Sequence, residues 1–183
     1  MEAKRMDEAE FIERHLILLL GVKKTPIPSV MHLQKEIFLL SNSKKSVADS
    51  FNFEKHYFGP FSQVLNEALK NPAHFSEAFN FDGDEISLTK NGGKEFLNMI
   101  KRFSKERDFK ILLSSLELLR NLYDRLTRDE IMFLTYNTYP EYTKLSQVSE
   151  RLLDNEYMRD KLSKSIFSKG LITQERYGEL KNG

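Results

Sequence analysis

The chain has 183 residues, with 28 basic and 27 acidic side chains and neither cysteine nor tryptophan. This length suits one domain, or one domain with an appended helical subdomain, and a hydrophobic share of 40% is enough for a buried core. Without cysteine, a disulfide framework, a thiolate zinc site and a cysteine nucleophile are all excluded.

The N-terminus is charged, with seven ionisable side chains among the first thirteen residues, and it lacks the pattern of a secretory signal peptide. The longest apolar run, Leu16–Leu20, has five residues, whereas a membrane-spanning helix needs about 20. We therefore expect a cytoplasmic protein that makes no membrane contact.

The first predicted elements are two helices. Apolar pairs at helical spacing predict a helix over Asp7–Leu20, closed by Gly21. A connector with two prolines separates it from a second predicted helix, Ser29–Leu40, because prolines so close together prevent helix continuation. A polar loop is expected over Ser41–Lys45.

An aromatic-rich segment, Phe51–Phe58, follows and is predicted to be extended until a Gly-Pro step breaks it. Helical spacing resumes over Phe61–Lys70. An Asp-Gly step between two alternating runs predicts a β-hairpin over Phe79–Leu88. Thr89 is the expected N-cap of the next helix, which runs to about Phe103.

The second half is predicted to be helical. A long amphipathic helix covers Phe109–Leu126, and Thr127–Glu130 matches a capping box that opens a helix reaching Tyr136. Tyr139–Tyr142 interrupts the pattern, and short helices follow. The predicted fold is mainly α: a winged-helix-like domain over residues 1–104, with helices and one small antiparallel hairpin, and a helical C-terminal subdomain over residues 105–183 packed on it.

The order helix, helix, extended segment, helix, hairpin, helix resembles a winged helix, in which three helices pack on a hairpin whose turn is the wing. Ile86–Gly92 resembles the wing strand that runs into the next helix in winged-helix regulators. In this segment Thr89 would cap the helix, and Gly92 would let the helix start approach the sheet.

Three further segments occur in order: His32–Leu40 with a Leu-Gln-Lys step, His56–Ser62 with Tyr-Phe-Gly-Pro, and Tyr139–Thr143. They resemble the bacterial and archaeal YwgA-like proteins and, more remotely, the SocA-like antitoxin (Panacea) domains, which share a Leu-Gln-Lys helix followed by a Tyr-Gly-Pro turn. Here a phenylalanine stands between the tyrosine and the glycine. The resemblance implies a helical, winged-helix-like protein without a known catalytic centre. For the Panacea relatives it implies an antitoxin that binds a toxin protein directly, and some relatives sit beside DNA-binding regions.

The motifs of common enzyme and metal sites are missing. The four histidines lie 17, 24 and 18 residues apart and have no partner at metal-ligand spacing. The Gly92–Glu95 segment lacks the first glycine and the hydroxyl of a phosphate-binding loop, and the acidic turn Asp82–Glu85 does not continue as a calcium loop. We predict a non-enzymatic protein with no catalytic residues, no metal site and no cofactor.

DNA is one candidate partner, although a net charge of +1 gives no global attraction to nucleic acid. In a winged helix the third helix enters the major groove, and here its predicted outward residues include Ser62, Gln63, Asn66 and Lys70, while Phe61, Val64, Leu65 and Leu69 are predicted to face inward. Lys101, Arg102 and Lys105 form a basic cluster that could add phosphate contacts. The acidic turn at the wing opposes DNA binding, because carboxylates there would repel phosphates.

A protein, for example a toxin, is the other candidate partner. Aromatic side chains gather at Tyr57, Phe58 and Phe61 around the Gly-Pro step and at Tyr139 and Tyr142, and such clusters provide core packing or interface contacts. The sequence thus favours a non-enzymatic regulatory or interaction protein that binds a protein partner. The alternative is a winged-helix DNA-binding regulator, and a homodimer is left open.

Overall fold

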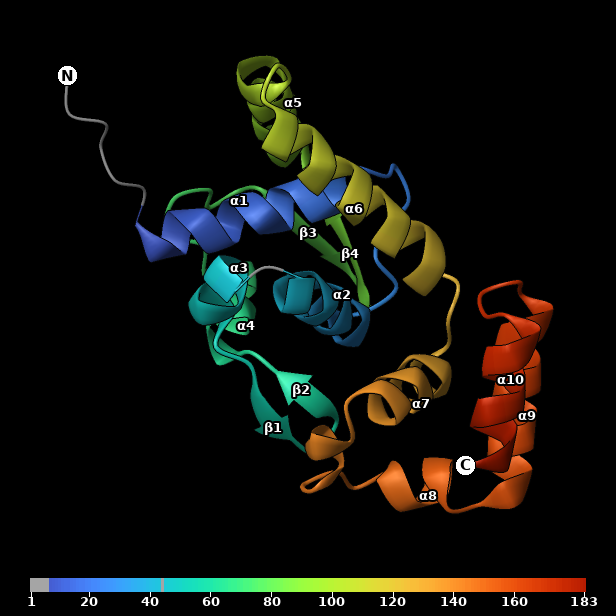
Figure 1. Ribbon diagram of the computed structural model, residues 1–183. Coiled ribbons are helices and arrows are strands. Elements are labelled where there is room, and N and C mark those ends of the chain that lie inside the picture. The colour runs from blue at the N-terminus through green and yellow to red at the C-terminus, as the bar shows by residue number, and fades with distance from the viewer. Residues whose placement is uncertain (1–6, 44) are drawn as a thin grey trace.

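The computed structural model describes residues 7–43 and 45–183, so predictions that fall on residues 1–6 and 44 lie outside the described residues. The fold is mainly α, with two small hairpins, as Figure 1 shows. The helices are α1 (Glu8–Gly21), α2 (Val30–Ser43), α3 (Lys45–Phe51), α4 (Gln63–Lys70), α5 (Lys90–Phe103), α6 (Arg107–Tyr123), α7 (Arg128–Thr138), the 3-10 helix η1 (Pro140–Thr143), α8 (Ser149–Leu153), α9 (Glu156–Ser168) and α10 (Gln174–Asn182). The strands are β1 (Glu54–His56), β2 (Gly59–Phe61), β3 (Phe79–Asp82) and β4 (Glu85–Leu88).

The first part of the chain ends in the sequence of α4, a β-hairpin and α5. The predicted hairpin is confirmed: β3 and β4 pair antiparallel from Phe79 opposite Leu88 to Asp82 opposite Glu85. Ile27, in the proline-containing connector, pairs with Ile86 through N–H···O bonds of 2.8 and 2.9 Å. This isolated β-bridge ties the segment between α1 and α2, which the sequence predicts only as a connector, to the hairpin.

Local capping signals place several helix starts where the sequence predicts them. The Asp7 side chain accepts a 2.8 Å hydrogen bond from the Glu10 amide, and the Thr89 hydroxyl accepts one of 3.1 Å from Gly92. At α7, Thr127 and Glu130 form the predicted capping box. Each cap satisfies a first-turn amide that has no partner inside its helix.

The region between α2 and α4 differs from its prediction. The α2 helix continues to Ser43, because the hydroxyls of Ser41 and Ser43 bond back to the carbonyls of Phe38 and Leu40 instead of opening a loop. A further helix, α3, ends at Phe51, where the next residue, an asparagine, adopts a left-handed φ of 43°.

The predicted extended segment shortens to β1, which pairs with β2 as a second hairpin. The helix predicted from Phe61 therefore begins two residues later, and Phe61 belongs to β2. Val64 is predicted to face inward but is 40% exposed, because the buried stripe of α4 consists of Leu65, Ala68 and Leu69 and Val64 lies at its edge.

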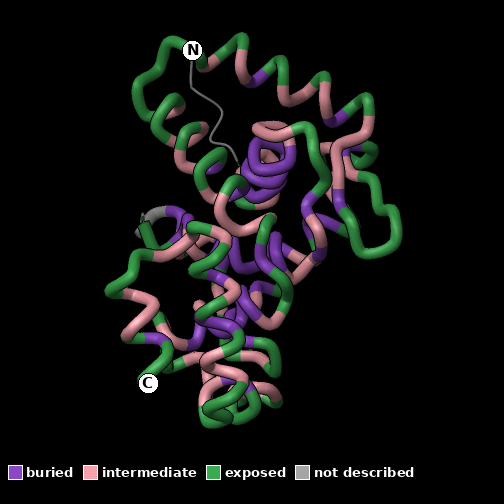
Figure 2. Tube along the Cα trace, turned by 90° about the vertical axis from the view of Figure 1, so that its right-hand side faces the viewer, coloured by how far each residue is buried: buried purple, intermediate pink, exposed green. Residues whose placement is uncertain are grey.

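Buried apolar side chains form two clusters. The first surrounds α1, in which Leu16, Ile17 and Leu19 are fully buried, and the second lies among α7, α8, α9 and α10 around Phe133 and Ile166. In Figure 2 the buried residues gather at the centre of the molecule, while the outer turns are exposed. The C-terminal subdomain is predicted to begin at residue 105, but α6 packs with the first cluster, and the buried residues of the second cluster begin after α6.

Within residues 7–43 and 45–183, no helix is long and apolar enough to cross a bilayer.

Candidate functional site

The three segments that carry the family resemblance lie together. On α2, the Gln34 side chain bonds both backbone groups of Ser62, accepting from its N–H at 2.9 Å and donating to its carbonyl at 3.0 Å. The Lys35 Nζ donates a 2.8 Å hydrogen bond to the carbonyl of Pro60. Both side chains are almost fully buried, so the Leu-Gln-Lys step holds the β1–β2 hairpin against α2.

Gly59 makes this close packing possible at the hairpin turn. Its φ of 78° lies in the left-handed region, and a Cβ added there would lie 3.2 Å from Met132 and 3.3 Å from Tyr136 of α7. A side chain at this position would therefore be strained by its backbone and crowded by its neighbours. Both effects favour glycine at this position of the Tyr-Phe-Gly-Pro step.

Aromatic rings join the third segment to the other two. Phe38 of α2 is buried and contacts the rings of Phe53, Tyr139 and Tyr142 edge-on, with centroid distances of 5.2, 4.9 and 5.0 Å. Such edge-to-face pairs add to the stabilisation from burial. Tyr139 and Tyr142 are thus half-buried members of this packing and present only part of each ring to the surface.

The tip of the β1–β2 hairpin carries adjacent exposed aromatic residues. Tyr57 is 53% exposed and Phe58 is 43% exposed, while Phe61 is half-buried and stacks on His56 at 4.8 Å. The loop after η1 is tied to this tip by a 3.1 Å hydrogen bond from the Gln147 amide to the Tyr57 carbonyl. The structure therefore brings the predicted partner-binding residues Tyr57, Phe58, Phe61, Tyr139 and Tyr142 to one side of the molecule.

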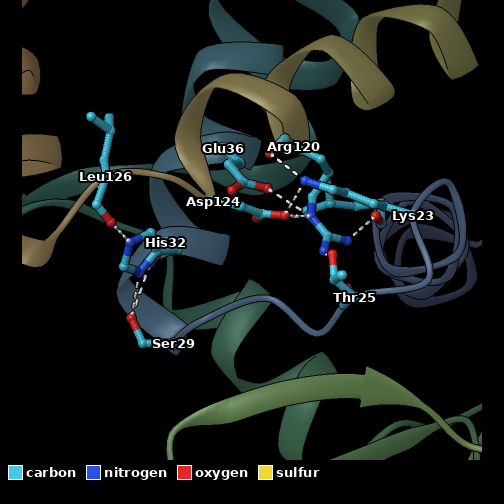
Figure 3. Close-up of polar contacts among 9 residues, drawn as sticks. Lys23, Thr25, Ser29, His32, Glu36, Arg120, Asp124 and Leu126 are labelled. Atoms are coloured by element: carbon cyan, nitrogen blue, oxygen red, sulfur yellow. Dashed lines mark hydrogen bonds and ion pairs between the residues drawn. The ribbon is translucent and has the colours of Figure 1, made fainter. Parts of the chain in front are cut away.

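The opposite side of α2 faces a buried ionic network (Figure 3). Arg120 of α6 is fully buried and donates to the carbonyls of Leu19 (2.9 Å) and Thr25 (2.5 Å), which fastens the end of α1. Its Nε bonds Asp124 at 2.9 Å and lies 4.0 Å from Glu36. Lys23 completes the network with a 3.2 Å ion pair to Asp124.

Glu36 is the unusual member of this network. It is fully buried, and among the described residues no donor lies within hydrogen-bond distance of either carboxyl oxygen. Burial, and then the nearby Asp124 carboxylate, raise the pKa of Glu36 well above its ordinary value, while Arg120 opposes the shift. When it is protonated, the Glu36 carboxyl group can donate a hydrogen bond to Asp124, and the repulsion between the two carboxylates is removed.

Burial also disfavours the charged forms of two neighbours on α2. Desolvation lowers the pKa of Lys35 to about 7, and it also lowers the pKa of His32. The His32 ring bonds the Ser29 hydroxyl and the Leu126 carbonyl, each at 2.8 Å. Because these groups are closed off from solvent and engaged with the backbone of other elements, they position segments of the chain.

Sequence reasoning missed these buried polar residues on α2 and α6. In the sequence, Gln34 and Lys35 enter only through the Leu-Gln-Lys resemblance, and no burial is predicted for them or for Glu36. A local sign is available at Phe38, which is predicted to be buried together with Leu33 and Ile37 but lies about 100° from Ile37 around the helix, so that a second face must also be buried.

The predicted DNA-contacting residues are divided. Ser62 is predicted to face outward, but it is fully buried, because its hydroxyl caps α4 and donates to the Phe51 carbonyl. Gln63 and Lys70 are exposed and Asn66 is half-buried, and the Gln63 amide donates a 2.6 Å hydrogen bond to Glu67 on the same helix.

The basic cluster of Lys101, Arg102 and Lys105 is exposed at the end of α5. Figure 1 shows α4 and α5 on different sides of α1. The acidic wing turn is exposed, and Asp84 there forms an ion pair with Arg128 of α7. The structure thus does not bring α4 and the basic cluster onto one surface.

Among the described residues, no group of three or more histidine, aspartate or glutamate side chains lies together as a metal site requires. Comparison with models of protein families and with curated proteins finds no match. The YwgA-like resemblance therefore stays a prediction, and the function proposed below is argued from the fold and from the contacts described above.

Proposed function

We propose that this protein is a non-enzymatic regulatory protein that binds a protein partner through the tip of the β1–β2 hairpin. The observation that carries the proposal is the pair of neighbouring exposed aromatic residues, Tyr57 and Phe58, on a hairpin whose base is fixed by buried hydrogen bonds. Aromatic residues supply much of the binding energy at protein interfaces. Because the base of the hairpin is rigid, its aromatic residues lose less conformational entropy on binding.

Paired variants test this role. Tyr57→Ala combined with Phe58→Ala removes the exposed rings, and Tyr157→Ala, at a residue of α9 that is 73% exposed, is the matched control. A partner protein captured by the wild type should bind the control with the same affinity and the double variant at least about tenfold more weakly. The affinity for the wild type should depend only weakly on salt. Equal binding by all three proteins would contradict the proposal.

DNA binding is the second candidate, favoured by the resemblance to a winged helix and by the β-bridge of Ile27 to the β3–β4 hairpin. Fluorescence anisotropy with random and self-promoter DNA, at about 50 and 200 mM salt, measures it directly. Tight, salt-sensitive binding that Gln63→Ala with Asn66→Ala weakens would replace the protein-binding proposal. We expect no binding at micromolar protein, because Ser62 is buried and the wing is acidic.

An antitoxin role is the finer form of the proposal, and it rests on the resemblance to Panacea domains. The partner would then be a toxin protein that the hairpin tip neutralises. Co-expression of the captured partner with the wild type should restore growth, and co-expression with the Tyr57→Ala, Phe58→Ala variant should not. A partner that does not slow growth on its own would contradict the antitoxin role but not the binding role.

A further inference from the structure

The β1–β2 hairpin is attached to α2 through side chains. Its strands pair with each other and with no other strand that the structure describes. The side chain of Gln34 bonds the backbone of Ser62, the Lys35 Nζ donates to the Pro60 carbonyl, and one backbone bond joins the tip to the loop after η1. An isolated two-stranded hairpin is only marginally stable, so this one can separate from α2 as a local unit while the two apolar clusters stay folded.

Lys35 lies beneath this hairpin without a charged partner. It is almost fully buried, and its Cε is 3.6 Å from the position that a Cβ on Gly59 would occupy. The carbonyl of Pro60 is the one acceptor that its Nζ has, although an ammonium group carries three N–H donors. An ionised ammonium is costly to bury without a counter-ion. The closed hairpin therefore favours the neutral amine, which can still donate to Pro60.

The elements packed around Lys35 supply no charge that compensates it among the described residues, and burial is the cause that lowers its pKa to about 7. Tyr136 of α7 approaches the same turn, but its hydroxyl is 2.5 Å from that of Ser146, and burial raises its pKa, so it stays neutral. The charged residues of α7 are paired elsewhere: Arg128 with Asp84, Asp129 with Arg151, and Glu130 with Lys169. The remaining titratable side chains of β1, η1 and this part of α2 are exposed, half-buried or turned toward α6: Glu54, Lys55, His56, Tyr139, Glu141, Tyr142 and Glu36.

We propose that the β1–β2 hairpin has a minor open state, in which it leaves α2 and Lys35 enters water and takes up a proton. Because the proton stabilises the open state more than the closed one, a fall in pH shifts the hairpin toward opening. With a pKa of 10.5 in water and about 7 in the closed hairpin, the opening constant should rise about 50-fold from about pH 9 to pH 7 and level off below that. The inference concerns the hairpin itself and holds whether or not its tip binds a protein.

Hydrogen exchange of the Ser62 amide measures this opening. The amide donates to the Gln34 side chain at 2.9 Å, so it exchanges when the hairpin leaves α2. Exchange of an open amide rises about tenfold per pH unit, and a hairpin recloses in about 1–10 μs, so the observed rate is the open-state rate multiplied by the opening constant. Between about pH 7 and 9 the Ser62 rate should rise only about twofold in the wild type, but about 100-fold in Lys35→Met, which takes up no proton on opening.

The Tyr177 amide, bonded to the Thr173 carbonyl at 2.9 Å in α10, is the control, because α10 packs on α9. Its rate should rise about 100-fold in both proteins, and comparing it with Ser62 in the wild type tests the proposal even if Lys35→Met does not fold. A rise of about 100-fold for Ser62 in the wild type would overturn the proposal. About 1 M urea should leave the Ser62 rate nearly unchanged, since local opening exposes little surface. A steep acceleration by urea would mean that Lys35 ionises only on global unfolding, and it would overturn the proposal as well.

Discussion

The ammonium group of Lys35 and the carbonyl oxygen of Pro60 are joined by a buried hydrogen bond of 2.8 Å. This bond connects the Leu-Gln-Lys step of α2 directly to the Gly-Pro turn of the β1–β2 hairpin. Two sequence segments 25 residues apart thus act as one structural unit that presents the exposed aromatic tip.

Replacement of Lys35 by methionine should change how stability depends on pH. Because burial lowers the pKa of Lys35 to about 7 from 10.5, the unfolded chain binds more protons than the folded protein between these values. Its contribution to the free energy of unfolding therefore rises with pH across that range, by up to about 1.4 kcal/mol per pH unit. Urea titrations from about pH 7 to 9 should give a shallower slope for Lys35→Met than for the wild type, and parallel curves would contradict this.

Replacement of Glu36 by glutamine should have the opposite pH signature. Since the pKa of Glu36 is raised above 4.5, the folded protein keeps a proton that the unfolded chain releases. The free energy of unfolding therefore falls as the pH rises above 4.5. A glutamine stays neutral and can still donate to Asp124.

We expect Glu36→Gln to match the wild type near pH 4.5 and to be more stable by about 1 kcal/mol or more at about pH 7.5. Glu36→Ala is the control, since it leaves a cavity and should destabilise the protein at every pH. If the stability of Glu36→Gln relative to the wild type instead falls between about pH 4.5 and 7.5, Glu36 is ionised in the folded state.

Replacement of Gly59 by alanine should destabilise the hairpin turn. Both the positive φ of 78° and the contacts of 3.2 and 3.3 Å with Met132 and Tyr136 oppose a Cβ, and we expect a loss of about 2–4 kcal/mol. Gly83 is the matched control, because its φ is 60° but no atom lies within 4 Å of an added Cβ. Gly83→Ala should lose only about 1 kcal/mol of stability in the same thermal unfolding experiment. Equal losses for the two variants would show that Met132 and Tyr136 move aside and that crowding does not contribute.

Two neighbouring glycines at the start of α5 should respond in opposite directions. A Cβ on Gly92 would lie 2.2 Å from the backbone oxygen of Ala78, so Gly92→Ala should lose about 3 kcal/mol. Gly93 has no atom within 4 Å of an added Cβ and lies inside the helix, so Gly93→Ala should gain about 0.5–1 kcal/mol. Chemical denaturation of the two variants measures both changes, and a neutral Gly92→Ala would disprove the close approach of α5 to the β3–β4 hairpin.

The sequence by itself determined the local elements. Asp7, Thr89 and Thr127 mark helix starts, and the Asp-Gly step marks the β3–β4 turn, because each of these interactions joins groups only a few residues apart. The mainly α fold and the exposure of the acidic turn follow from such signals.

Only the tertiary structure decided which polar side chains are buried and which aromatic rings are exposed. Lys35, Glu36 and Arg120 are charged residues that a helical pattern assigns to the surface, and they are buried because their partners come from elements far along the chain. The exposure of Tyr57 and Phe58, in contrast with the half-buried Tyr139 and Tyr142, likewise depends on how the hairpin and η1 meet at Phe38. Burial is a property of the assembled core, and local sequence spacing does not contain it.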